Sequence, residues 1–185
     1  YEYELIKDKI SSLDPDLIIM YDGWNELRSQ FPAEKTIRNW ESVCKLGKNE
    51  GFDTIVVVQP LPITGQRVTT EQELLNSIPN LPYIEKSQQY VDAFEELDSA
   101  CTKTADFRRI FDYVQEPIFY DAGHTMSFGN KIIAKNIFSV ISIESPAISF
   151  FNSTSAFILS LFIWLLAEMI ILSASSVAFF FASEI

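Results

Sequence analysis

Two short runs of apolar residues set the strongest limit on how this chain can fold. The first covers residues 17–20 (Leu-Ile-Ile-Met), and the second covers residues 54–58 (Thr-Ile-Val-Val-Val), which is also rich in β-branched side chains. A strand with one face toward solvent alternates polar and apolar positions, whereas a uniform apolar run is typical of a parallel strand that is covered on both faces. Both runs therefore predict buried strands of a parallel sheet.

The segments around these runs have the periodicity of helices. Those with apolar residues at helical spacing are residues 2–12, 33–49, 83–101 and 127–141. A further short helix is expected to begin at Thr70, because Thr70 and Glu73 fit a capping box. A third short strand is expected within residues 105–111. Strands that alternate with helices indicate an α/β layer fold.

The number of predicted strands is small for such a fold. An open parallel sheet normally has four or more strands, and the chain offers three. Its first residue is Tyr1 rather than Met, and the helix over residues 2–12 should cross over from an earlier strand. We therefore expect one or more strands to precede Tyr1 in the complete protein.

The acidic net charge and the number of cysteines limit the classes of function that this chain can have. The chain has 14 Lys and Arg residues against 25 Asp and Glu residues. Such an acidic surface repels phosphate backbones, so nucleic acid is excluded as a partner. Cys44 and Cys101 are too few for a disulfide scaffold and match no zinc spacing. Because each falls among apolar residues at a helical interval, both are interpreted as small buried hydrophobic side chains.

Candidate catalytic residues lie in two loops that follow apolar segments, where α/β enzymes place their sites. The first loop, residues 21–26, contains Asn25. The second loop, residues 120–126, contains Asp121 and His124, the only histidine of the chain. The two loops therefore define the candidate site.

The spacing of Asp121 and His124 suits general base catalysis. Across three residues of a tight turn, the Asp121 carboxylate can accept a hydrogen bond from the imidazole Nδ1–H. That bond fixes the tautomer and leaves Nε2 as the base, as in a Ser-His-Asp triad. The alternative is that Asp121 or Thr125 only caps the helix that follows.

Asn25 is the candidate for a second role in the same site, stabilisation of the oxyanion. Its side-chain amide, placed after a glycine at a strand end, can stabilise a developing oxyanion. The alternative is a turn asparagine that hydrogen-bonds its own backbone. Gly23 and Trp24 are assigned to the substrate-binding side of the same loop, although the core is the favoured place for the Trp24 indole.

Together the two loops resemble two conserved blocks of the SGNH (GDSL-type) hydrolases. The third block of that family is Gly-x-Asn-Asp, and residues 23–26 read Gly-Trp-Asn-Glu. The fifth block is Asp-x-x-His, and residues 121–124 read Asp-Ala-Gly-His. As in the family, a glycine (Gly129) and an Ile-Ile-Ala helix (residues 132–134) follow. The resemblance covers residues 1–143.

The resemblance implies a three-layer, flavodoxin-like sandwich with a parallel sheet, and an ester hydrolase that works without metal or cofactor. Asp121 and His124 would belong to the triad, Asn25 to the oxyanion hole, and the substrate would be a small-molecule or glycan ester. The first block, Gly-Asp-Ser with the nucleophile, does not occur in the sequence. We expect this block, and the unrecognised second block, to precede Tyr1. The alternative is a membrane-tethered domain of the same type that has a binding or structural role and no catalytic activity.

The composition changes abruptly after the last predicted helix. Residues 156–182 contain one charged residue, Glu168, and are long enough to cross a bilayer. We therefore expect a partial hydrolase domain over residues 1–143, a linker over residues 144–155, and a C-terminal apolar transmembrane helix over residues 156–182. This organisation predicts a membrane-associated protein at the cell surface. The alternatives are a buried helical hairpin and an out-of-frame or assembly product.

Overall fold

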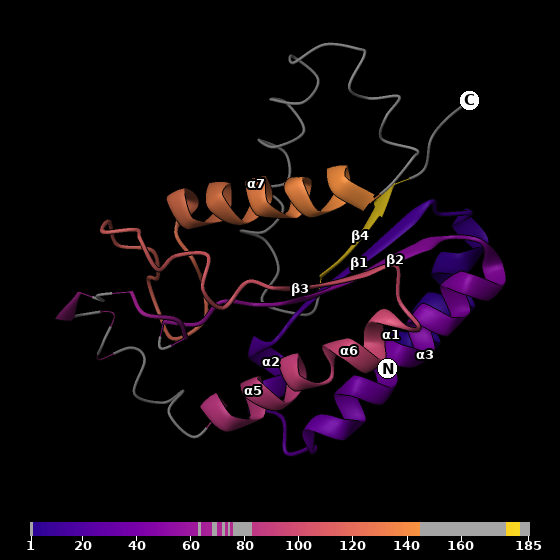
Figure 1. Cartoon of the computed structure of the whole chain (residues 1–185), viewed down its shortest axis with the longest axis horizontal. Coiled ribbons are helices and arrows are strands. Elements are labelled where there is room, and N and C mark those ends of the chain that lie inside the picture. The colour runs from indigo at the N-terminus through magenta and orange to yellow at the C-terminus, as the bar shows by residue number, and fades with distance from the viewer. Residues whose placement is uncertain are drawn as a thin grey trace, which may run out of the picture. The chain divides into compact units, whose positions relative to one another are not determined.

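The chain consists of two compact units, which are described separately. The computed structural model describes residues 2–62, 64–67, 70, 71, 73, 75, 83–144 and 177–181 (Figure 1). One unit, called here the sheet unit, comprises Tyr1–Gln59, Pro82–Asp106 and Ser175–Ile185. The other, called the His124 unit, comprises Pro60–Leu81 and Phe107–Ala174.

A four-stranded sheet forms the centre of the sheet unit. Its strands are β1 (Leu17–Asp22), β2 (Asp53–Val58), β3 (Lys103–Asp106) and β4 (Val177–Phe181), in the order β3-β2-β1-β4. The strands β1, β2 and β3 are parallel, and β4 runs antiparallel to β1. All six residues of β1 and five of the six in β2 are buried. The two apolar runs are therefore the two inner strands, and the predicted α/β fold with a parallel sheet is confirmed.

The register of the two inner strands brings their carboxyl ends together. Leu17 pairs with Asp53, and Asp22 pairs with Val58. One residue further on, the Gln59 backbone N–H donates to the Asp22 carbonyl at 2.7 Å. The loop that starts at Gly23 therefore leaves the sheet beside Gln59.

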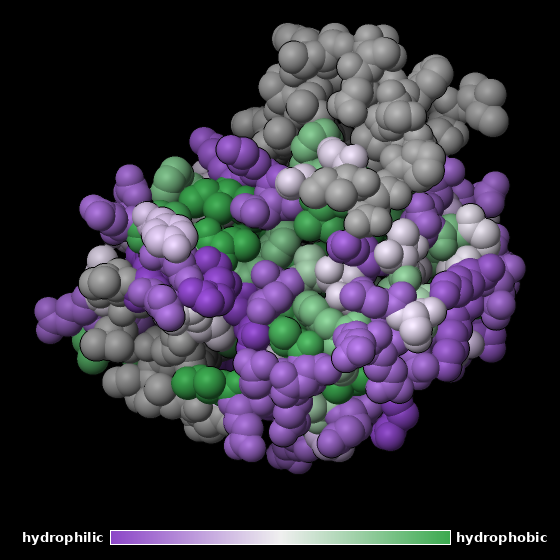
Figure 2. Space-filling model, in the orientation of Figure 1, coloured by the Kyte–Doolittle hydropathy of each residue, from purple (hydrophilic) through white to green (hydrophobic). Residues whose placement is uncertain are grey.

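Helices of the sheet unit cover one face of the sheet (Figure 1). They are α1 (Glu2–Leu5), α3 (Ala33–Glu50), α5 (Ile84–Asp92) and α6 (Phe94–Asp98). Hydrophilic side chains dominate their solvent side (Figure 2). As expected, α3 buries Trp40 and is followed by Gly51, its C-cap, which has φ 95°. The single helix predicted over residues 83–101 is instead two helices that meet at Ala93.

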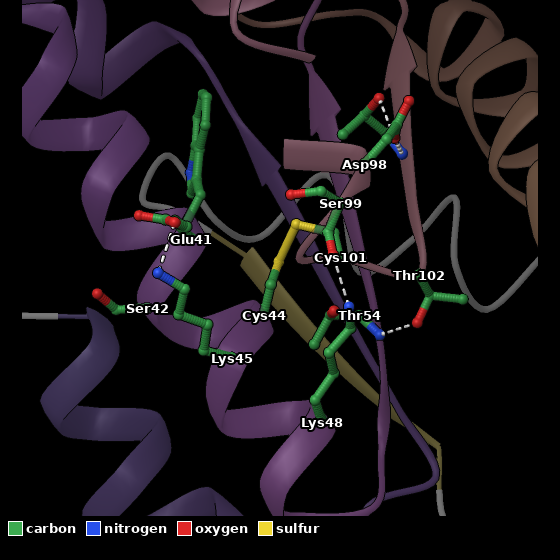
Figure 3. The surroundings of a disulfide bond; sticks show 12 residues. Glu41, Ser42, Cys44, Lys45, Lys48, Thr54, Asp98, Ser99, Cys101 and Thr102 are labelled. Carbon is green, nitrogen blue, oxygen red and sulfur yellow. Dashed lines mark hydrogen bonds and ion pairs between the residues drawn. A yellow bond between two sulfur atoms is a disulfide. The ribbon is translucent and has the colours of Figure 1, made fainter. Parts of the chain in front are cut away.

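The cysteines form a disulfide bond, which the sequence interpretation missed (Figure 3). Cys44 lies on α3, Cys101 lies in the turn before β3, and their Cα atoms are 4.6 Å apart. Both residues are buried, as predicted, but they are not free thiols. Beside the bond, the Lys48 ammonium donates to the Ser99 carbonyl at 2.6 Å. The pairing escaped sequence reasoning because only the packing of α3 against this turn brings together residues that are 57 positions apart.

The described part of the apolar tail differs from the prediction. Residues 177–181 were expected within a helix over residues 156–182, yet they form β4 along the edge of β1. Their sequence, Val-Ala-Phe-Phe-Phe, is rich in side chains that favour strands. The helix prediction is therefore wrong for these five residues, and residues 156–176 and 182 lie outside the described part.

The remaining boundaries are close to those expected. Among the described residues, no helix has both the length and the hydropathy needed to cross a membrane. The third strand was expected within residues 105–111, but it starts earlier and ends at Asp106. In the His124 unit, α7 (Ser127–Glu144) matches the last predicted helix, and it buries Ile133, Ile137 and Ile141.

Candidate active site

Asp121 and His124 lie in the turn of a short hairpin in the His124 unit. The hairpin comprises residues 118–126 and is called here the His124 hairpin. Its arms meet at a single bridge between Phe119 and Thr125. Two backbone hydrogen bonds join the arms, from Tyr120 N to His124 O at 3.1 Å and from Met126 N to Ile118 O at 2.6 Å. The hairpin thus sets the separation of the two side chains.

The predicted contact between these side chains is confirmed. His124 Nδ1 lies 2.7 Å from Asp121 Oδ2. Asp121 Oδ1 accepts from the backbone N–H groups of Gly123 and His124, at 2.8 and 2.7 Å. Both carboxylate oxygens are therefore used within the turn, before α7 begins at Ser127, so helix capping by Asp121 is not its role. The tautomer with the proton on Nδ1 leaves Nε2 able to accept a proton.

The electrostatics of the turn favour an ionised aspartate. Partial burial raises the pKa of the Asp121 carboxyl, but the hydrogen bonds from Gly123 and His124 outweigh it and hold the pKa below its usual range. The His124 side chain remains 33% exposed, and the Tyr120 ring stacks on the imidazole with their centroids 5.5 Å apart. An anionic partner and a stacked ring thus orient an imidazole that solvent and ligands can reach.

A close approach of α7 to the hairpin explains why a glycine follows the motif. A Cβ atom on Gly129 would lie 2.9 Å from Ile118 Cγ2 and 3.0 Å from Thr125 Cβ. The Thr125 hydroxyl also donates to the side-chain oxygen of Asn130. The first turn of α7 therefore packs directly against both arms of the hairpin, and a larger residue at position 129 would push them apart.

A buried ion pair supports the arm of the hairpin that contains Ile118 and Phe119. Arg67 and Glu73 have side chains that are only 3% and 2% exposed. Arg67 Nη1 and Nη2 donate to Glu73 Oε1 and Oε2 at 3.0 and 2.8 Å. Glu73 Oε1 also accepts from the backbone N–H groups of Ile118 and Phe119, at 2.8 and 2.9 Å. The capping box predicted the contact of Glu73 with Thr70. No signal in the sequence identified the hydrogen bonds that connect Glu73 to the hairpin.

The Glu73 carboxyl should make the His124 unit sensitive to acid. Burial raises its pKa, but the hydrogen bonds from Arg67, Phe119, Ile118 and Thr70 outweigh that effect and lower the pKa from 4.5 to about 2. A depressed pKa stabilises the folded state above the unfolded-state value, and this stability is lost as the pH falls toward the folded-state value. We expect a loss of about 3 kcal/mol between pH 4.5 and 2. Urea unfolding of wild type and Glu73→Gln across this range tests it, because the variant should lack that part of the pH dependence.

In the sheet unit, the Gly23 turn and the short helix α2 (Trp24–Arg28) carry Asn25. Gly23 has φ 153°, and a Cβ there would lie 3.1 Å from Gln59 Cβ. The Gln59 side-chain oxygen accepts from Trp24 N at 2.9 Å. Glu26 Oε2 accepts from Gly23 N at 3.0 Å. Glu26, which stands where the SGNH block that this turn resembles has aspartate, thus closes the turn.

A lysine closes the far end of α2. Lys86 Nζ donates to the backbone carbonyls of Glu26 and Ser29, at 2.6 and 3.2 Å. Asn25 itself is exposed, in the first turn of the helix. Trp24 is only partly buried, with the Arg28 guanidinium 4.7 Å from its ring centroid, so the favoured placement in the core is wrong. Of the two tryptophans in the described part of the chain, Trp40 is the buried one, and its indole N–H donates to Asp22 at 2.6 Å.

Each half of the candidate site is thus built by its own unit. Asp121 and His124 meet within the His124 unit, while Gly23, Trp24 and Asn25 share one turn of the sheet unit. That Asn25 faces the same cleft as His124 stays a prediction. No group of three or more His, Cys, Asp or Glu side chains suited to a metal ion occurs in the described part of the chain. Comparison with known proteins finds no matching family model, curated protein or solved structure.

Proposed function

We propose that this chain is the C-terminal part of a serine-type ester hydrolase of the SGNH kind, with the three-layer, flavodoxin-like fold of that family. The observation that carries the proposal is the 2.7 Å contact between Asp121 Oδ2 and His124 Nδ1. It occurs in a turn whose sequence and following glycine resemble the fifth block of the family. His124 is the general base, Asp121 orients and stabilises it, and Asn25 contributes to the oxyanion hole.

The proposed reaction is acyl transfer through a serine supplied by the part of the protein before Tyr1. The serine Oγ attacks the ester carbonyl while His124 Nε2 takes its proton, and the Asn25 amide donates to the oxyanion. As the carbon–oxygen bond of the ester breaks, the imidazolium returns the proton to the departing alcohol. Water, deprotonated by the same nitrogen, then releases the acid. The substrate is a small-molecule or glycan ester, bound on the side of Gly23 and Trp24.

The disulfide bears on the cellular compartment in which the protein functions. Such bonds persist in oxidising surroundings and are rare in the cytosol of mesophiles. The buried Cys44–Cys101 bond therefore supports a place outside the reducing cytosol, which agrees with the proposed location at the cell surface. Attachment to the membrane stays a prediction for residues 156–176.

The proposal is tested by comparing two lengths of the protein. The 185-residue chain has a base and part of an oxyanion hole, but no nucleophile to form an acyl intermediate. We expect almost no hydrolysis of p-nitrophenyl acetate by this chain, and turnover by a version that is extended through an upstream Gly-Asp-Ser. Replacing that serine with alanine is the matched control. Robust turnover by the short chain, or none by the extended one, would contradict the proposal, and the second result would favour a binding domain.

A further inference from the structure

Few interactions join the two arms of the His124 hairpin to each other. Its arms share one isolated bridge, and an isolated pair of short strands is marginal in water. Support must therefore come from neighbouring groups. α7 approaches the hairpin through Gly129. In addition, two consecutive backbone N–H groups of the first arm, those of Ile118 and Phe119, both donate to the same oxygen, Glu73 Oε1.

The charge of Glu73 is balanced by a group that also holds the chain before the hairpin. Arg67 contacts both oxygens of Glu73, and it donates to the backbone carbonyls of Val114 and Glu116 at 3.1 and 2.7 Å. A buried carboxylate is tolerated only when it is paired and hydrogen-bonded, and this one is both. The pair therefore fixes the backbone from residue 114 to residue 119, directly before the turn with Asp121.

We propose that Glu73 is a positioning residue for His124, which acts by holding the first arm of the hairpin where Asp121 meets the imidazole. Glu73 does not touch the reacting atoms, because its carboxylate is used by Arg67, Thr70 and the two hairpin amides. Its effect on catalysis rests on the proposed function. Its effect on the tautomer of His124 does not, because that tautomer exists without substrate or nucleophile.

The test uses His124 as a probe, since it is the only histidine in the chain. Long-range ¹H–¹⁵N spectra of the ¹⁵N-labelled 185-residue protein at neutral pH report which ring nitrogen carries the proton. We expect wild type to show the Nδ1–H tautomer, and Asp121→Asn provides the reference for its loss. Thr70→Val, which removes a hydroxyl contact to Glu73 Oε2 but none to Oε1, should leave the wild-type spectrum unchanged.

Two double variants isolate the acceptor at position 73. Arg67→Met with Glu73→Gln removes both charges and keeps a side-chain oxygen for the Ile118 and Phe119 amides. Arg67→Met with Glu73→Leu removes both charges and the acceptor. Neither leaves an unpaired buried charge, so both are expected to fold. We expect the glutamine version to keep the Nδ1–H signal and the leucine version to lose it, with its two ring nitrogens becoming averaged.

If Glu73 had only a structural role, the two double variants would show the same His124 tautomer. A retained Nδ1–H signal in the folded leucine version would therefore overturn the proposal. If that version does not fold, Glu73→Asp replaces it. This change keeps the charge beside Arg67 but withdraws the carboxylate from the two amides. We therefore expect the Nδ1–H signal to be lost here too, and a retained signal would overturn the proposal. If the tautomer depends on Glu73 while the extended protein hydrolyses no ester, the positioning role stands and the proposed function fails.

Discussion

Replacement of His124 by alanine should lower kcat/KM of the serine-bearing protein for p-nitrophenyl acetate by roughly 10⁶-fold. In the proposed mechanism the imidazole takes the serine proton and returns it to the alcohol, and the chain has no other histidine. Asp121→Asn should cost less, roughly 10⁴-fold, because the base stays present but loses the acceptor for its Nδ1–H. Steady-state kinetics of the three proteins give the comparison.

A control variant makes the result specific. Tyr113→Phe, at a site 98% exposed in the same unit, should leave the rate unchanged. A His124→Ala protein with wild-type kinetics would mean that another group acts as the base, and the proposed roles of Asp121 and His124 would both be wrong.

The features that could be predicted from the sequence are those that local interactions determine. The strands β1 and β2 were identified because uniform apolar runs require cover on both faces. The contact of Asp121 with His124 was foreseen because three residues of a turn limit how far apart the side chains can be. The capping box at Thr70 and Glu73 is equally local. In each case, the partners are close in sequence or the pattern has one physical reading.

The features that were missed depend on pairings across long stretches of chain. Glu73 meets Phe119 across 46 positions, and nothing in either local sequence points to the other. The apolar run that contains residues 177–181 fits a helix or a strand equally, and the pairing with β1 decides between them. The partial burial of Trp24 likewise follows from how the helices pack. Such choices are made by tertiary contacts that override local preference.

The disulfide offers a second large effect, this time on stability. Replacing both cysteines with alanine should lower the free energy of unfolding of the sheet unit by about 4 kcal/mol, because the bond closes a loop between residues 57 positions apart and so restricts the unfolded chain. Guanidinium unfolding with and without Cys44→Ala and Cys101→Ala, in a background with Trp24 and Trp164 replaced by phenylalanine so that only the buried Trp40 fluoresces, measures the difference. Trp40 and Cys44 lie one helical turn apart on α3, so this signal reports on the helix that the bond holds.

A reductant distinguishes the stability that comes from the covalent bond from the stability that comes from the packing of the two sulfur atoms. Dithiothreitol present during unfolding and refolding should weaken wild type by about the same 4 kcal/mol and leave the alanine variant unaffected, because only wild type has a bond to lose. Since Cys44 and Cys101 are almost fully buried, the native protein should resist reduction until it opens. Alkylation of two free thiols in protein that was unfolded without reductant would contradict the bond. The support that the disulfide gives to an oxidising location would then be lost, whereas the interpretation of Asp121 and His124, which lie in the other unit, would be unaffected.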